Sequence, residues 1–246
     1  MAKRFITNEN LFPDIEPEHE IPLPADIIKH ALIVTRLKTG DTLEIQTPQK
    51  RRITARITSH EIKNPKIVVL NSVTNPPTPI SPSIHAFIAM IKWPRFEWAL
   101  EKLAELGVTT ITPVISHRCI IKIDTGVWNT KFPRFNKILT QAARQSLANQ
   151  VPELKPPLNF TQSIQTITKI SGCALIASTT DCPPISKAQI YYPVAFLTGP
   201  EGGFCENEIN DAINTGIQPV KLTENILRAE TAPVVITAYL MLRALD

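Results

Sequence analysis

Val194-Ala-Phe-Leu-Thr-Gly199-Pro-Glu-Gly-Gly203-Phe-Cys-Glu-Asn-Glu-Ile209 holds three of the eight glycines in this chain of 246 residues. The apolar run from Pro193 to Leu197 predicts a buried strand, and the apolar spacing from Cys205 to Ile213 predicts a helix. The glycines between them tolerate positive φ and have no Cβ, so backbone groups there can approach a ligand closely. The segment predicts a ligand-binding loop, and the alternative is a tight turn that only joins strand and helix.

The residues beside these glycines exclude the common phosphate-binding loop. That loop needs a lysine and a hydroxyl residue directly after its last glycine, whereas Phe204 and Cys205 follow Gly203. Pro200 removes one amide donor, and Glu201 puts negative charge where a phosphate would lie. The loop is better matched to hydroxyl groups or to a cationic ligand.

The glycine segment is followed by a second motif, Leu222-Thr-Glu-Asn-Ile-Leu-Arg228-Ala-Glu230-Thr-Ala232. Val220 to Leu222 predicts a short strand, and Thr231 is predicted to cap a last apolar helix over Val234 to Leu245. Arg228 and Glu230 thus lie between apolar elements, where charged groups need partners. Two interpretations stay open: a structural ion pair, or active-site groups whose partners include the substrate.

Four prolines within residues 75–82 mark a boundary, because proline continues neither a helix nor a central strand. Before it, the short β-branched runs typical of a small antiparallel barrel lie at 42–45, 51–57 and 66–70. After it, predicted strands at 84–90, 110–115, 173–177, 194–198 and 219–222 alternate with predicted helices at 95–106, 134–148 and 206–214. This alternation predicts an α/β fold, a mostly parallel sheet with helices on both faces.

The two motifs resemble those of the RsmE family of ribosomal RNA methyltransferases, which belongs to the knotted SPOUT superfamily. The resemblance rests on Leu197 to Phe204, Glu208-Ile209 and Ile226 to Ala232. Further matches occur in chain order at Arg4, His30, Val34, Arg36, Gly40, Asp41, Lys92, Glu97, Lys102, Glu105 to Val108, Pro113, Arg118, Gln145-Ser146 and Val151-Pro152. Together they cover nearly the whole chain.

The resemblance implies a more specific architecture than the sequence pattern does. Residues 1–74 are expected to form a PUA-like, RNA-binding β-barrel, and residues 75–82 a proline-rich linker. Residues 83–246 are expected to form a SPOUT methyltransferase domain whose last segments thread into a trefoil knot. The family also implies a homodimer.

The resemblance implies S-adenosylmethionine as the cofactor, bound by three loops of the knot. The residue types agree, because glycines admit the adenosine, apolar side chains can hold adenine, and Glu201 suits a ligand with a sulfonium and hydroxyls. The residues expected to bind it are Ala177, Gly199, Glu201, Gly202, Leu222, Ile226 and Leu227.

The implied reaction is methylation of uridine N3 in 16S ribosomal RNA, the RNA of the small subunit, on the assembled 30S particle. The N3 proton must leave before or during attack on the methyl group, so the site must stabilise negative charge on the uracil oxygens. We expect Arg228 to do so, with Glu230 as its orienting partner or as proton acceptor. The RNA contacts are expected from Arg4, Arg36, Lys92, Arg95, Lys102 and Arg118. For Lys102 the alternative is a methylene stem that only shields the core.

Several positions depart from the family pattern, among them Thr223 in place of the glycine of Gly-x-Arg and residues 177–180 in place of a loop that ends in histidine-proline. Asn225 stands where the family has the arginine of Gly-x-Arg, Ala148 replaces the arginine of Gln-Ser-x-Arg, and Cys205 replaces a helix-capping serine. Two other functions therefore stay open. One is a non-catalytic protein of this fold that binds ribosomal RNA or assists assembly, and the other is a SPOUT methyltransferase acting on another RNA, such as transfer RNA.

Composition fits these expectations without requiring them. A net charge of +4 and a pI near 8.9 permit RNA binding. The four cysteines form no Cys-x-x-Cys and no metal-like spacing with histidine, which predicts reduced thiols and no metal site. The start of the chain lacks the apolar core of a signal peptide, and the apolar stretch 234–242 is too short to span a membrane. We expect a cytoplasmic protein.

Overall fold

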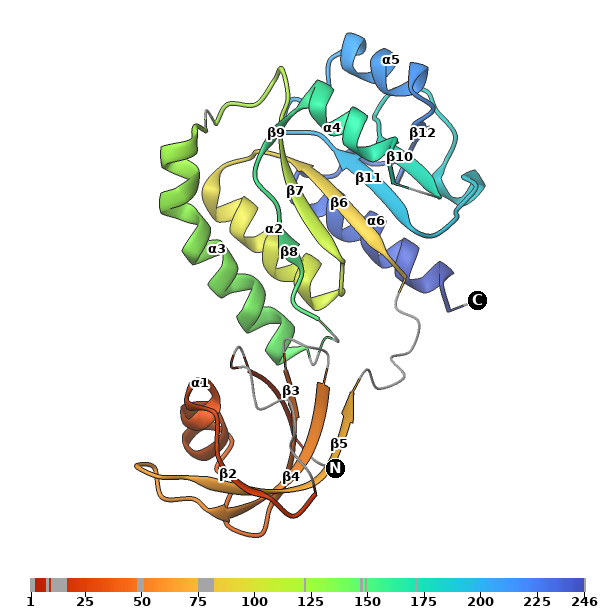
Figure 1. Cartoon of the computed structure of the whole chain (residues 1–246). Helices are drawn as coiled ribbons and strands as arrows, with labels where there is room; N and C mark the ends of the chain where they lie inside the picture. The colour runs from red at the N-terminus through yellow and green to blue at the C-terminus, as the bar shows by residue number, and fades with distance from the viewer. Residues whose placement is uncertain are drawn as a thin grey trace. The chain divides into compact units, whose positions relative to one another are not determined.

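The computed structural model describes residues 3–7, 9, 17–47, 51–74, 82–121, 123–146, 148, 150–170 and 172–245 (Figure 1). The chain divides into two compact units, residues 1–79 and 80–246. The division falls in the proline-rich stretch 75–82, of which residues 75–81 lie outside the described residues. Each unit has its own buried core.

The amino-terminal unit contains a five-stranded sheet with the order β1-β3-β4-β5-β2. Its strands are β1 (Lys3–Ile6), β2 (Glu20–Pro22), β3 (Thr42–Gln46), β4 (Arg51–Ser59) and β5 (Lys66–Thr74). The three strands predicted in this unit are observed as β3, β4 and β5. The sequence predicted an antiparallel sheet in this unit. Because β1 runs parallel to β3, the observed sheet is mixed. A pairing of β1 with β2, which would close a barrel, is not found among the described residues.

The core of this unit follows from the alternation of side chains along its strands. In β4, Ile53, Ala55 and Ile57 are buried, because successive side chains of a strand point to opposite faces. Helix α1 (Ala25–Ile28) and its π-helical continuation η1 (Lys29–Val34) cover this face with buried Ile27 and Ala31.

The carboxy-terminal unit is built on a seven-stranded sheet with the order β12-β10-β11-β6-β7-β8, in which β9 also pairs with β7. Its strands are β6 (Ile84–Ala89), β7 (Thr110–Ile115), β8 (Glu153–Leu154), β9 (Leu158–Asn159), β10 (Cys173–Ala177), β11 (Val194–Thr198) and β12 (Gln218–Val220). Every pairing of these strands is parallel. The predicted parallel sheet is therefore confirmed.

Helices cover both faces of this sheet (Figure 1). Ala86 and Ile88 of β6 pack on the side of α2 (Trp93–Glu105), α3 (Thr125–Gln145) and α6 (Thr231–Arg243). Phe87, which points to the opposite face, packs on the side of α4 (Phe160–Ile167) and α5 (Glu206–Asn214). A short 3-10 helix, η2 (Ile185–Lys187), lies between β10 and β11 in the chain.

Several boundaries differ from the predicted ones for local reasons. Helix α3 begins at Thr125, not at Arg134, because the Asp124 carboxylate accepts a hydrogen bond of 2.8 Å from the Val127 N–H and caps the helix. Helix α6 begins at Thr231 itself, so the predicted cap lies inside the helix and Glu230 takes the cap position. Strand β12 ends at Val220, which leaves Leu222 in the loop that follows.

Candidate functional site

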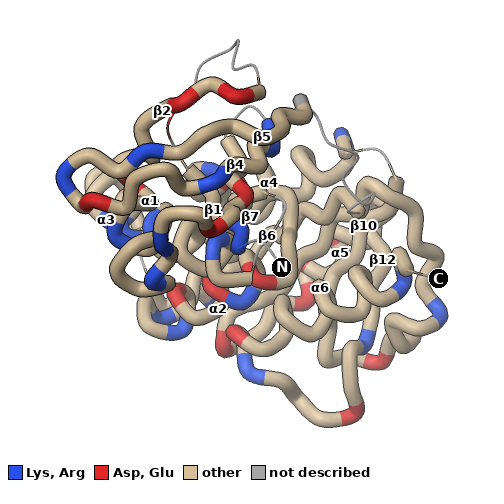
Figure 2. Tube along the Cα trace, turned by 90° about the horizontal axis from the view of Figure 1, so that it is seen from below, with Lys and Arg blue, Asp and Glu red and all other residues tan. Residues whose placement is uncertain are grey.

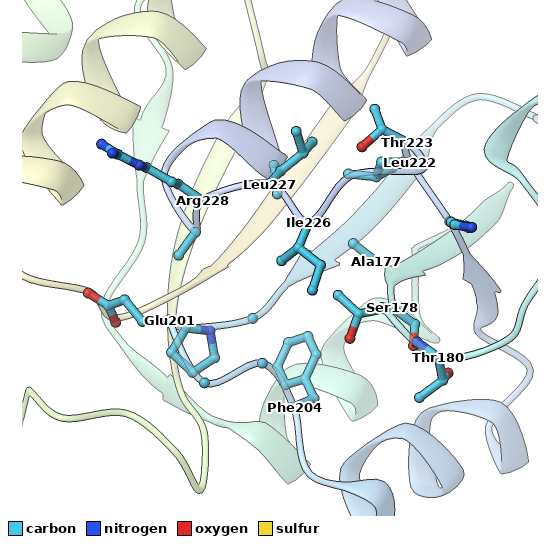
Figure 3. A pocket seen from close by; sticks show the side chains of 18 of the residues that line it. Ala177, Ser178, Thr180, Glu201, Phe204, Leu222, Thr223, Ile226, Leu227 and Arg228 are labelled. Carbon is cyan, nitrogen blue, oxygen red and sulfur yellow. Dashed lines mark hydrogen bonds between the residues drawn. The ribbon is translucent and has the colours of Figure 1, made fainter.

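Three loops that follow neighbouring parallel strands surround one cavity of the carboxy-terminal unit (Figure 3). Strand β10 lies between β11 and β12, and all three run in the same direction. Their carboxyl ends therefore meet at one edge of the sheet, where open α/β sheets bind ligands. The cavity has a volume of about 590 Å³ and is lined by residues 177–180, 199–204 and 221–229 with Arg95, Ile209 and Ala232.

The structure brings together all seven residues that the resemblance assigns to cofactor binding, because each of them lines this cavity. Ala177 comes from the loop after β10, and Gly199, Glu201 and Gly202 from the glycine loop (Gly199–Gly203) after β11. The other three, Leu222, Ile226 and Leu227, come from the β12 loop (Leu222–Arg228). Lining residues that were not among the expected cofactor contacts include Ser178 and Thr180, whose types carried no distinctive pattern, and Phe204, which ends the glycine motif.

The glycine loop is folded tightly on itself. A Cβ on Gly199 would lie 3.1 Å from the Phe204 nitrogen and 3.2 Å from the Gly203 carbonyl carbon, so a side chain there would force backbone to move. Gly203 adopts a φ of +67°, which glycine accepts without strain. Its N–H donates a hydrogen bond of 2.8 Å to the Pro200 carbonyl.

Two charged side chains hold the glycine loop from outside. Arg118 donates from Nη1 to the Gly202 carbonyl at 2.8 Å. Glu208 on α5, which is only 7% exposed, accepts hydrogen bonds from the Cys205 N–H at 2.9 Å and from the His117 N–H at 2.8 Å. Glu208 thus satisfies the N–H of Cys205, whose thiol is a weaker helix cap than the serine hydroxyl of the family pattern. A glutamate three residues after a helix cap is a known capping pattern that could have revealed this role in the sequence.

The β12 loop has few internal restraints. Within the described residues, no N–H group from Leu222 to Arg228 donates a backbone hydrogen bond. Ile226 is 83% exposed, and Figure 3 shows its side chain directed into the space between Ser178 and Phe204. An exposed apolar side chain that lines a cavity is available for contact with a bound ligand.

Charged side chains gather at one end of the cavity. Arg95, in the first turn of α2, lies with Nη1 at 3.8 Å from Glu201 Oε1 and with Nε at 3.7 Å from Glu230 Oε1. Arg228 and Glu201 extend toward the same side of the cavity in Figure 3. Among the described residues, the Arg228 side chain forms no ion pair or hydrogen bond.

The expected pair of Arg228 and Glu230 is therefore not formed. Glu230 is 9% exposed, does not line the cavity and has Arg95 as its ion-pair partner. The two residues are close in sequence, but Glu230 occupies the cap position of α6, and its side chain is buried while Arg228 is exposed. Both residues lie between β12 and α6 in the chain, as expected, but only Glu230 is buried.

The six basic residues expected to contact RNA are in different surroundings. Arg4 pairs with Glu44 at 3.0 Å. Lys102 hydrogen-bonds Glu101 and Glu105 at 2.7 Å, and both bonds raise its pKa. Arg95 lines the cavity and pairs with Glu201 and Glu230, whereas Arg118 holds the glycine loop from outside. Arg36 and Lys92 are exposed and have no side-chain partner in the described part of the chain.

Acidic and basic residues are interspersed along the described part of the trace (Figure 2). Within the described ranges, no group of three or more His, Cys, Asp or Glu side chains could hold a metal ion. Over the same residues, no helix is both long and apolar enough to cross a membrane.

Comparison with known proteins finds related methyltransferases. A family model described as an RNA methyltransferase domain matches residues 78–241. The ribosomal RNA small subunit methyltransferase E of Synechocystis sp. is 34% identical over 62% of this chain, and the match spans only about half of that relative, 51% of its length. The protein of that name from Buchnera aphidicola subsp. Acyrthosiphon pisum is 30% identical over 82% of this chain and 79% of its own.

A solved structure resembles the whole chain. The crystal structure of a ribosomal RNA small subunit methyltransferase E from Neisseria gonorrhoeae bound to S-adenosyl methionine superposes with a TM-score of 0.81. It is 29% identical in sequence, and the match covers 99% of this chain and 98% of that one.

Proposed function

This chain belongs to the ribosomal RNA small subunit methyltransferase E family, and we propose that it transfers a methyl group from S-adenosylmethionine to small-subunit ribosomal RNA. The observation that carries the proposal is the convergence of the three loops on one cavity of about 590 Å³, a volume typical of small-ligand sites. The Neisseria gonorrhoeae relative, which has this fold, binds S-adenosylmethionine.

The lining of the cavity fits this cofactor. The missing Cβ of Gly199 keeps the glycine loop compact, so that a ligand can lie against its backbone. Ile226 offers an exposed apolar surface for an adenine ring, and the Glu201 carboxylate complements a positively charged sulfonium. When bound, S-adenosylmethionine supplies a methyl group that the positive charge on its sulfur makes reactive.

We propose N3 of a uridine in 16S ribosomal RNA, within the assembled 30S subunit, as the methyl acceptor. Loss of the N3 proton spreads negative charge over the flanking uracil oxygens, which a guanidinium stabilises. Arg228 suits this role because its side chain lines the cavity, is exposed and has no partner among the described residues. Arg36 and Lys92 are the basic candidates whose side chains are exposed and uncommitted, so they are proposed as RNA contacts.

The finer architecture of the family is part of the same proposal. Residues 1–74 would serve as a PUA-like, RNA-binding barrel, joined by residues 75–82 to the methyltransferase domain at residues 83–246. The segments around the glycine loop and the β12 loop would thread as a trefoil knot, with two copies forming a homodimer. The enzyme would act in the cytoplasm, where its ribosomal substrate is found.

The proposal is tested by methyl transfer from labelled S-adenosylmethionine to small ribosomal subunits that lack the modification. Free ribosomal RNA and transfer RNA serve as parallel substrates, and the product nucleotide is mapped. We expect one uridine of 16S RNA to be methylated at N3, and Arg228→Ala to abolish transfer while cofactor binding persists. Transfer only to transfer RNA, or cofactor binding without transfer to any RNA, would contradict the proposed substrate or the proposed activity.

A further inference from the structure

Arg95 links three segments that are far apart in the sequence. It belongs to α2, while Glu201 lies in the glycine loop and Glu230 caps α6. The distances of 3.8 Å and 3.7 Å are ion-pair distances, too long for hydrogen bonds. One guanidinium is therefore shared between a carboxylate that lines the cavity and one that is buried behind it.

The buried member of this cluster is incompletely satisfied. Glu230 is 9% exposed, and its Oε2 is buried without a hydrogen-bond partner among the described residues. A buried carboxylate that loses its only cation is strongly destabilised, because it then lies uncompensated in a medium of low polarity. Among the residues that the structure describes, Arg95 is the cation that balances Glu230, so the conformation at the start of α6 depends on it.

From this geometry we infer that Arg95 is a positioning residue of the cofactor cavity and that Glu230 is its buried counter-ion, not a proton acceptor. Arg95 holds the glycine loop through Glu201 and the first turn of α6 through Glu230. The β12 loop runs directly into the start of α6, so one side chain holds the glycine loop and the point at which the β12 loop ends. The inference rests on the proposed function, because the cavity is taken to bind S-adenosylmethionine.

The inference separates Arg95 from the residues proposed to contact RNA. A positioning residue acts on cofactor affinity, whereas a direct RNA contact acts on RNA affinity. The buried charge provides the sharper distinction. If Glu230 serves as the counter-ion of Arg95, removing both charges should lower stability and cofactor affinity less than removing the cation alone.

The test uses the full chain with Arg95→Gln, Arg95→Lys, Glu230→Gln and the double variant Arg95→Gln/Glu230→Gln. Calorimetry gives the dissociation constant for S-adenosylmethionine, thermal unfolding gives stability, and turnover gives the KM values for cofactor and RNA. We expect Arg95→Gln to weaken cofactor binding on the order of tenfold and to leave the KM for RNA unchanged. Arg95→Lys should retain part of the affinity, and the double variant should bind more tightly and melt higher than Arg95→Gln.

A matched control is an ion pair between α2 and the neighbouring helix α3. The exposed Arg134 of α3 pairs with Glu97 of α2 at 2.6 Å, and neither residue lines the cavity. Arg134→Gln should leave the cofactor dissociation constant unchanged. If Arg95→Gln itself fails to fold, folding of the double variant supports the inference and failure of both contradicts it.

Two results would overturn the inference. One is unchanged cofactor affinity in Arg95→Gln together with weaker RNA binding. The other is a fold-loss of cofactor affinity in the double variant that equals the product of the fold-losses in the two single variants. Wild-type protein that binds the cofactor but methylates no RNA would contradict only the proposed function. If it bound no cofactor at all, the melting temperatures of the four variants would still test the coupling of Arg95 to Glu230.

Discussion

The glycine loop and the β12 loop form facing walls of one cavity but differ in how they are held. The glycine loop is fixed by its own turn, by Arg118 and by the buried Glu208. The β12 loop has no amide that donates a backbone hydrogen bond within the described residues, and it exposes Ile226. One wall is thus completed by the protein, whereas the other is completed when a ligand covers it.

This difference explains why the two walls use different residues. A wall that meets the ligand through its backbone must keep one conformation, which requires glycine and buried hydrogen bonds. A wall that closes on the ligand gains stability from apolar area covered at that moment. Changes to the glycine loop should therefore disturb folding and binding together, whereas changes to the β12 loop should disturb binding alone.

The largest effect is expected from Gly199→Ala. Its methyl group would lie 3.1 Å from the Phe204 nitrogen, a backbone atom that cannot rotate away. Overpacking of this kind costs about 1–3 kcal/mol, so calorimetry should show cofactor affinity reduced by roughly 5- to 150-fold. In Gly202→Ala the new methyl group would meet only the flexible Arg118 side chain at 3.4 Å, and the loss should be clearly smaller. Equal losses in both variants would contradict the assigned turn.

The next effect is expected from Glu208→Gln. A glutamine offers one oxygen in place of two, so either the Cys205 or the His117 N–H would face an amide donor. Leaving one buried donor unsatisfied should lower the free energy of unfolding by about 2 kcal/mol, measured by chemical denaturation, and should also weaken cofactor binding. Glu206→Gln changes an exposed residue of the same helix turn and is the control. A Glu208→Gln protein as stable as this control would show that the loop is not held there.

A different pattern is expected from Ile226→Ser. Because Ile226 is already exposed, the free energy of unfolding should change by less than about 0.5 kcal/mol. Cofactor affinity should fall about tenfold, since the ligand loses apolar contact area. Ile213→Ser, on an exposed position of α5 outside the cavity lining, should change neither quantity. Loss of stability without loss of affinity would reverse the assignment of the two walls.

The smallest effect is expected from Glu224→Gln in the β12 loop. Lys221 donates a hydrogen bond of 2.6 Å to Glu224, and this bond raises the pKa of Lys221. Such a pair stabilises the fold below the ordinary pKa of lysine and loses its effect as the pH rises through the raised value. Because Glu224 is 90% exposed, the melting temperature at neutral pH should not change, while an NMR titration should show the pKa of Lys221 lowered. A clear drop in melting temperature would mean that the β12 loop is held more firmly than described.

The sequence revealed the parts of the site that depend on local chemistry. The glycine loop was predictable because glycine, which has no Cβ, fits a tight turn, and the apolar patterns on either side show where the strand ends and the helix begins. The parallel sheet was predictable because apolar strands alternate with helical spacing. The predicted helix boundaries were wrong at α3 and α6. There a single residue at the cap position, Asp124 or Glu230, determines where the helix begins.

The partners of the charged residues could not be read in the same way. Arg228 and Glu230 are neighbours in sequence, yet Glu230 pairs with Arg95, which lies more than a hundred positions earlier in the chain. Arg118 and Glu208 likewise act across segments that meet only in the folded sheet. Such pairings depend on strand order, and strand order is not encoded in any local pattern.

The contrast between the two walls is tested most directly by amide hydrogen exchange, followed by NMR with and without S-adenosylmethionine. Without cofactor, the amides of Gly203 and Cys205 should already be protected, because both donate hydrogen bonds within the protein. The amides from Leu222 to Arg228 should exchange rapidly and become protected only when the cofactor binds. Equal protection of both loops before binding, or no change in the β12 loop after binding, would contradict the account.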